Sequence, residues 1–259
     1  AETGSSPFDH RVWVFAGDGC MEEGITSEAA SLAGHQELGN LICIYDDNHI
    51  SIEGNTDVAF SEDVLKRYEA YGWHVQKVDL GLDGDVDVMA LASAMDNAKA
   101  EHGRPSLISL RTIIAWPAPT LQNTGKSHGS ALGADEVAAT KTAMGMDPAQ
   151  DFAVSPQVLD HVRQVKSRGA GAHSEWQATF DAWQQAHPDR VALLDRLVAQ
   201  ELPADLADAL PRFDPSKPMA TRKASGECIN AIAAVMPEFW GGSADLAESN
   251  LTTIEGGGS

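Results

Sequence analysis

The sequence has few cysteines, few aromatic residues and no long apolar run. Its three cysteines, Cys20, Cys43 and Cys228, form no Cys-x-x-Cys pair. A reducing, cytoplasmic setting is therefore expected rather than a disulfide scaffold. No apolar run approaches the roughly eighteen residues that a membrane-spanning helix needs, and no basic segment followed by an apolar one suggests a secretory signal. We therefore expect no membrane partner.

Basic residues are also scarce, with 18 Lys and Arg against 38 Asp and Glu and a formal net charge of −20. This charge argues against a general surface for nucleic acids or anionic membranes. A local basic pocket for a phosphorylated ligand stays possible, because exposed charges are screened over about 8 Å at physiological salt. Apolar residues make up 43% of the chain and charged residues 22%, which is typical of globular proteins.

A strand, a helix and a second strand are predicted within the first 45 residues. Residues 11–16 and 41–45 are apolar runs bounded by glycine or polar residues, and both are expected to be buried strands. Between them, Ile25, Ala29 and Leu32 fall on one helical face. This order predicts a right-handed unit with two parallel strands.

Polar residues follow both predicted strands. Asp18 lies after the first strand, and Asn48 lies after the second, thirty positions later. If the strands are neighbours, they lie about 5 Å apart, so both oxygen donors could reach one Mg²⁺ that also binds phosphate oxygens. Gly17 and Gly19 flank the aspartate and allow backbone N–H groups to approach an anion at the start of the helix.

The same alternation continues and predicts an α/β fold in which helices flank a largely parallel sheet. The expected elements are a helix starting at residues 61–63, a strand at 73–78, a helix over 88–98 capped by Asp85 or Asp87, and a strand at 106–114.

Residues 115–133 interrupt this alternation. They are rich in proline, glycine and polar residues, so we expect a long loop without regular structure, which is typically functional or disordered. Residues 125–129 match the Gly-x-Ser-x-Gly pattern of hydrolase nucleophile elbows. We reject that interpretation, because an elbow needs a strand directly before its serine and here a proline-rich loop precedes Ser127.

The remaining sequence predicts a mainly helical connector, a linker and the start of another domain. Helices are expected at 134–145, 158–165, 175–186, 191–199 and 221–235, with breaks at the glycines of 169–171 and at His187-Pro188. Residues 202–219 contain four prolines and indicate a linker. Residues 239–243 are expected to form the first strand of a second α/β domain.

Together, these motifs resemble those of the transketolase family. The resemblance begins with Gly17-Asp18-Gly19 followed by Asn48, and it extends through residues 22–34, 45–52, 67–74, 127–133, 220–225, 241–246 and 249–252. It implies the thiamine diphosphate-binding fold. It also implies a diphosphate and Mg²⁺ domain over residues 1–150, a linker over 151–218 and the start of a pyrimidine-binding domain over 219–259.

The resemblance assigns roles to particular residues. Asp18, Asn48 and the carbonyl of Ile50 would hold Mg²⁺, or another divalent cation such as Ca²⁺, on the diphosphate. Gly17 and Gly19 would let the backbone meet the cofactor, and Glu23 would support this site. His128 would contact the diphosphate and act near the substrate. The resemblance further implies that Arg222 and Ser249 bind the substrate phosphate, and that Asp245 and Leu246 lie near the cofactor of a partner subunit in a homodimer.

The function implied is transfer of a two-carbon ketol unit between sugar phosphates in the pentose phosphate pathway. Donors would include xylulose 5-phosphate or sedoheptulose 7-phosphate, and acceptors ribose 5-phosphate or glyceraldehyde 3-phosphate. The family's catalytic glutamate has no counterpart in these 259 residues, so the chain alone is expected to be inactive. Dihydroxyacetone synthase and deoxyxylulose phosphate synthase share the magnesium motif, and two further alternatives are a magnesium-dependent phosphohydrolase and a binding module without catalysis.

Overall fold

The computed structural model describes residues 6–258. The chain divides into two compact units, with the boundary in the sequence between Phe180 and Asp181. The predicted domain boundaries at residues 150 and 218 stay predictions.

The first unit is built on a parallel sheet of four strands in the order β1-β2-β6-β5. All three neighbouring pairs run parallel, as the sequence predicts. The strands are β1 (Val12–Gly17), β2 (Leu41–Asp47), β5 (His74–Val78) and β6 (Ser106–Arg111). Because β1 and β2 are direct neighbours, with Gly17 in register with Asp46, their carboxyl ends lie side by side.

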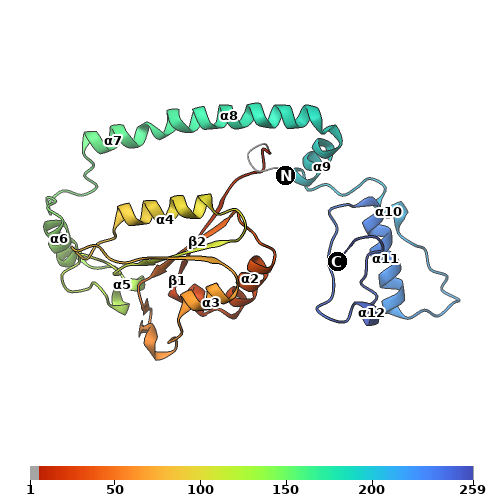
Figure 1. The fold of residues 1–259 in the computed structure, drawn as a ribbon, viewed down its shortest axis with the longest axis horizontal. Coiled ribbons are helices and arrows are strands. Elements are labelled where there is room, and N and C mark those ends of the chain that lie inside the picture. Colours follow the sequence, from red (N-terminus) through yellow and green to blue (C-terminus); the bar gives the residue numbers. More distant parts are fainter. Residues whose placement is uncertain (1–5, 259) are drawn as a thin grey trace. The chain divides into compact units, whose positions relative to one another are not determined.

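Helices cover both faces of this sheet (Figure 1). One face carries α1 (Asp18–Glu22), α2 (Gly24–His35) and α3 (Val64–Ala70), and the other carries α4 (Val88–Ala100). Strand β2 contributes to the buried clusters on both faces of the sheet, because its successive side chains point to opposite faces. Cys43 and Tyr45 enter one buried cluster, and Ile42 and Ile44 enter the other. The α/β fold is thus confirmed.

Two aspartates fix helix starts that the sequence predicts. The side chain of Asp63 accepts a hydrogen bond from the backbone N–H of Lys66 at 3.1 Å, just before α3. Asp87 accepts from Ala90 at 2.9 Å and caps α4. Each side chain satisfies a backbone donor that the first helical turn leaves free.

Strand β1 is less buried than its apolar sequence predicts. It lies at the edge of the described sheet, where Phe15 is 77% exposed and Val14 is 39% exposed. The prediction of a fully buried strand is wrong here, because hydrophobicity indicates a tendency to be covered but does not supply the element that covers it.

Small elements lie between the strands and the following helices. They are β3 (Ile50–Ser51), β4 (Gly54–Asn55), the 3₁₀ turn η1 (Thr56–Val58), α5 (Gly125–Gly129) and α6 (Ala134–Ala143). The strands β3 and β4 pair as an antiparallel hairpin directly after Asn48. The prediction that residues 115–133 lack regular structure is wrong, because α5 forms within them.

The remaining helices are α7 (Pro156–Arg163), α8 (Val165–Ala186), α9 (Pro188–Val198), α10 (Leu206–Ala209), α11 (Thr221–Val235) and α12 (Ala247–Asn250). Helix α8 continues through Gly169 and Gly171, so the predicted break there is wrong. A glycine inside a helix costs only about 1 kcal/mol, which the rest of a long helix can offset. Among residues 6–258, no helix combines the length and apolarity that crossing a membrane requires.

The strand predicted at residues 239–243 does not form. These residues have no regular structure in the second unit. An extended segment becomes a strand only by pairing with a neighbour, and the described part of this unit has no sheet that these residues could join.

Candidate functional site

Asp18 and Asn48 meet at the carboxyl end of the sheet, as the sequence predicts. Asp18 is the first residue of α1, directly after β1, and Asn48 directly follows β2. Both are buried, with 3% and 7% of their surface exposed. Burial of two polar side chains at neighbouring strand ends indicates a functional site, because each needs partners to offset its lost hydration.

The carboxylate of Asp18 accepts hydrogen bonds from the chain after β2. The backbone N–H groups of Asn48 and His49 donate to Oδ2 at 3.2 and 3.0 Å. The Tyr45 hydroxyl donates to Oδ1 at 2.7 Å. Asp18 therefore joins the end of β1 directly to the end of β2, a link that the sequence motif does not reveal.

The backbone turns at His49, so that the N–H groups of Asn48 and His49 both point toward Asp18. The φ of His49 is +64°, a left-handed conformation that is uncommon for a residue with a side chain. Successive N–H groups in such a turn form a concavity that favours negative charge. The side chain of His49 also pairs with Asp47, with Nε2 2.8 Å from Oδ1.

The side chain of Asn48 is held by the residues two positions before and two positions after it. Its Oδ1 accepts from the backbone N–H of Ile50 at 2.9 Å, and its Nδ2 donates to Oδ2 of Asp46 at 3.2 Å. Ile50 itself is buried and begins β3. These bonds fix the rotamer of Asn48 and keep its amide oxygen at the start of the hairpin.

Tyr45 is a site residue that the sequence analysis missed. Burial raises the pKa of its phenol, and the hydrogen bond to Asp18 and the negative charge of Asp47 raise the pKa further. The phenol therefore stays protonated and donates to Asp18 at all physiological pH values. The strand period could have revealed Tyr45, because side chains two positions apart lie on the same face of a strand. Tyr45 therefore shares a face of β2 with Asp47.

A cavity of about 300 Å³ adjoins this network. Asp18, Tyr45, Asp47 and His49 contribute to its wall. Asp47 also accepts a hydrogen bond from the Ser109 hydroxyl at 3.1 Å, which ties the cavity to β6. The space lies against the buried carboxylate and is large enough for several water molecules or part of a ligand.

The glycines around Asp18 leave open space rather than permit a special backbone conformation. The φ of Gly17 is −99°, which any residue can adopt. A Cβ atom added at Gly17 or at Gly19 would meet no other atom within 4 Å. Glu23 is exposed and links α1 to α2. The Cβ side of both glycines is therefore open, and the approach of a ligand to them stays a prediction.

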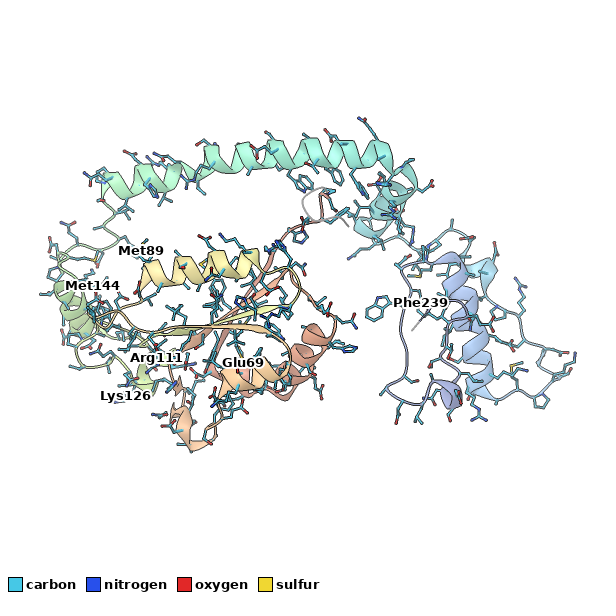
Figure 2. The ribbon with its side chains drawn as sticks, in the orientation of Figure 1. Glu69, Met89, Arg111, Lys126, Met144 and Phe239 are labelled. Carbon is cyan, nitrogen blue, oxygen red and sulfur yellow. The ribbon has the colours of Figure 1, made fainter. Side chains whose placement is uncertain are left out.

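The His128 segment packs against the hairpin that follows Asn48. Helix α5 contacts both β3 and β4, and a Cβ on Gly125 would lie 2.9 Å from the Ile52 carbonyl oxygen. His128 is exposed, on the same short helix. Figure 2 marks α5 by Lys126 and the end of β6 by Arg111. The structure thus connects the His128 segment to the Asn48 end of the sheet through β3 and β4.

The predicted residues of the second unit include one pair in contact. Nη1 of Arg222, on α11, donates to the backbone carbonyl of Ser249, on α12, at 3.4 Å. Asp245 and Leu246 are exposed and lie directly before α12. The structure therefore brings Arg222 and Ser249 together, although 27 positions separate them.

The donors at the sheet edge fit a divalent cation with phosphate ligands. Asp18 Oδ1 and Asn48 Oδ1 each accept one hydrogen bond and keep a second lone pair. Across residues 6–258, no three His, Cys, Asp or Glu side chains converge on one point. A cation here would thus complete its coordination with backbone carbonyl, water or ligand oxygens, as Mg²⁺ commonly does.

Fold and site together define an α/β domain with an oxygen-donor site at the carboxyl end of a parallel sheet. Residues 1–203 match the family model described as "Transketolase, thiamine diphosphate binding domain". The chain therefore belongs to the transketolase family, as its motifs predict.

Curated relatives from distant organisms agree with this assignment. The chain is 57% identical to the transketolase of Mycobacterium leprae over 256 residues, which cover 98% of this chain and 36% of that protein. It is 45% identical to the chloroplastic transketolase of Zea mays, covering 95% of this chain and 36% of the relative. The chain thus spans about a third of the length of these relatives.

Solved structures agree on the fold. A Pichia stipitis transketolase in complex with sedoheptulose-7-phosphate superposes with a TM-score of 0.84 at 41% identity, over 95% of this chain and 36% of that one. Transketolase from Leishmania mexicana gives a TM-score of 0.88 at 36% identity, over 98% and 37%. The thiamine diphosphate-binding fold is therefore confirmed.

Proposed function

We propose that this chain is the diphosphate-binding part of a transketolase, which moves a two-carbon ketol unit from a ketose phosphate to an aldose phosphate. The observation that carries the proposal is the buried pair of Asp18 and Asn48 at neighbouring strand ends, tied together by the backbone N–H groups of residues 48 and 49. Relatives named transketolase, at 45–57% identity, support the reaction class.

In this proposal Asp18, Asn48 and the Ile50 carbonyl hold a divalent cation, Mg²⁺ or Ca²⁺, on thiamine diphosphate. The cofactor supplies the carbanion chemistry when bound, and the chain supplies binding and orientation. The N–H of Gly19 meets the diphosphate, since the space above this glycine and Gly17 is open. Glu23 supports the same end of α1.

His128 is proposed to bind the diphosphate and to move protons near the reacting sugar. An imidazole can donate hydrogen bonds to phosphate oxygens and can act as a general acid or base. His128 is exposed on α5, where a ligand can reach it.

In the second unit, Arg222 and Ser249 are proposed to bind the phosphate of the sugar. The guanidinium already lies beside Ser249, and its planar fork matches two phosphate oxygens. Asp245 and Leu246 are proposed to face the cofactor of a partner subunit, in a homodimer that works in the cytoplasm on sugar phosphates.

Isothermal titration calorimetry of the 259-residue chain with thiamine diphosphate tests the cofactor site. We expect binding that requires Mg²⁺ and that EDTA abolishes. Asp18→Asn should weaken it at least about tenfold, because the cation loses its one charged side-chain ligand. Asp57→Asn is the matched control, since Asp57 is exposed and lines the same cavity without following a strand of the sheet.

Three results would contradict the proposal. They are the absence of thiamine diphosphate binding, binding that does not depend on Mg²⁺, and equal weakening by Asp18→Asn and Asp57→Asn. Phosphatase activity without thiamine diphosphate would favour the phosphohydrolase alternative instead. The absence of ketol transfer by the 259 residues alone stays a prediction, which a transfer assay with xylulose 5-phosphate and ribose 5-phosphate tests.

A further inference from the structure

The segment directly before α5, the helix that carries His128, is closed on itself by hydrogen bonds. The backbone N–H of Asn123 donates to the carbonyl of Ile114 at 2.9 Å, so the chain returns to the end of β6. Within the segment, the hydroxyl of Thr124 donates to the Leu121 carbonyl at 2.7 Å, and Ala118 is completely buried. Residues 114–124 therefore form an ordered loop whose ends lie close together.

One side chain from outside this loop holds its middle. Glu136, in the first turn of α6, accepts from the backbone N–H groups of Thr120 and Leu121 through Oε1, at 2.7 and 2.9 Å. Its Oε2 accepts from the Thr120 hydroxyl at 2.8 Å. Three donors thus converge on one carboxylate, and hydrogen bonds to an ionised acceptor are about twice as strong as neutral ones.

The held loop is continuous with the functional site. Four residues after Leu121 comes Gly125, which would have a Cβ 2.9 Å from the Ile52 carbonyl and 3.0 Å from the Gly54 nitrogen. This close approach seats α5 on the hairpin whose first residue, Ile50, donates to the amide oxygen of Asn48. A shift of residues 120–121 would therefore change how α5, and His128 with it, sits on the hairpin.

We propose that Glu136 is a positioning residue, which sets the place of His128 at the cofactor site by holding residues 120–121. We call the three hydrogen bonds between Glu136 and residues 120–121 the tether. The identity of the ligand rests on the proposed function, and the tether rests on the structure alone. Glu136 touches neither the cation ligands nor the cavity beside Asp18. It acts only through the loop and α5.

A carboxamide is the side-chain group that can replace the Glu136 carboxylate and keep its three hydrogen bonds. In Glu136→Gln the amide oxygen can accept from both backbone N–H groups, and the NH₂ group can donate to the Thr120 hydroxyl oxygen. Glu136→Ala leaves all three donors without this acceptor. Asp135→Ala is the matched control, since Asp135 is exposed, lies in the same helical turn and has a side chain that forms no hydrogen bond in the described structure.

Hydrogen exchange of the free chain, followed by mass spectrometry, tests the tether without any ligand. We expect Glu136→Ala to speed amide exchange of residues 118–124 by about tenfold or more, while the sheet strands keep their protection. Glu136→Gln and Asp135→Ala should exchange like the unaltered chain. Unchanged exchange in Glu136→Ala, or faster exchange spread equally over the sheet, would overturn the tether.

Calorimetry with thiamine diphosphate and Mg²⁺ tests the consequence for the site. Glu136→Ala should weaken binding several-fold, while Glu136→Gln and Asp135→Ala leave it unchanged. Equal affinities in all four chains would overturn the positioning role even if the tether exists. If the unaltered chain does not bind thiamine diphosphate at all, the proposed function fails, and the exchange measurement still decides the tether.

Discussion

Tyr45 and Asp18 are joined by a buried hydrogen bond in which the phenol donates to Oδ1 at 2.7 Å. The donor comes from β2 and the acceptor from the first residue after β1. This bond orients the carboxylate from inside the protein, and Oδ1 keeps a second lone pair for a ligand. A cation at Asp18 would thus meet a side chain that is already held in place.

Tyr45→Phe should weaken both folding and cation binding. The substitution leaves the buried carboxylate without one of its three donors, which should lower the unfolding free energy by about 1–2 kcal/mol. Urea denaturation of the free chain measures this change, and calorimetry should show weaker Mg²⁺-dependent binding of thiamine diphosphate. Tyr71→Phe is the control, because no hydrogen bond of the Tyr71 hydroxyl is found among residues 6–258. Equal effects of the two substitutions would contradict the role of Tyr45.

Gly19→Ala should separate ligand binding from stability. An added Cβ meets nothing within 4 Å in the free chain, and alanine is favoured over glycine inside a helix such as α1. Urea denaturation should therefore show no loss of stability. Calorimetry should show at least about tenfold weaker binding, because the methyl group occupies space proposed for the diphosphate. Unchanged binding would place the diphosphate elsewhere.

Gly34→Ala, unlike Gly19→Ala, should lower the stability of the chain. Its Cβ would lie 1.9 Å from the Tyr71 carbonyl oxygen and 3.4 Å from Cδ1 of Trp73, so α2 could not keep its distance from the turn after α3. We expect a loss of about 3 kcal/mol in unfolding free energy, measured by urea denaturation. A stability equal to that of the unaltered chain would show that this packing is looser than the structure has it.

The tether at Glu136 should be lost at acidic pH. The hydrogen bond from the Thr120 backbone is the largest cause that lowers the pKa of Glu136 below its ordinary value of 4.5, followed by the Thr120 hydroxyl and the Leu121 backbone. The tether is therefore intact above about pH 4.5 and weakens as the pH falls through the lowered pKa. Exchange rates of residues 118–124, corrected for intrinsic rates, should rise in that window.

Glu136→Gln provides the control for this pH dependence, because its amide does not titrate. Protection of residues 118–124 in Glu136→Gln should stay constant over the same range, apart from changes that also affect the sheet. The same loss of protection in both chains would assign the acid effect to other carboxylates.

Much of the first unit could be predicted from periodicity and end signals. The runs at residues 11–16 and 41–45, the caps at Asp63 and Asp87 and the spacing of Asp18 from Asn48 are local features, and each predicts its element without distant contacts. Four predictions of local structure fail. Among residues 6–258, nothing covers the exposed side chains of β1, and residues 239–243 have no strand to pair with. Helix α8 continues through its glycines, and α5 forms within residues 115–133.

The candidate site likewise combines features that the local sequence predicts with features that depend on distant contacts. The sequence by itself determined which residues can bind a cation and where each follows its strand, because residue type and strand order are local properties of the chain. Only the tertiary structure decided that Tyr45 and the N–H groups of Asn48 and His49 converge on Asp18, and that Glu136 holds the loop before His128. Those contacts join segments 15 to 31 positions apart, and their geometry depends on sheet register and helix packing that no local pattern encodes.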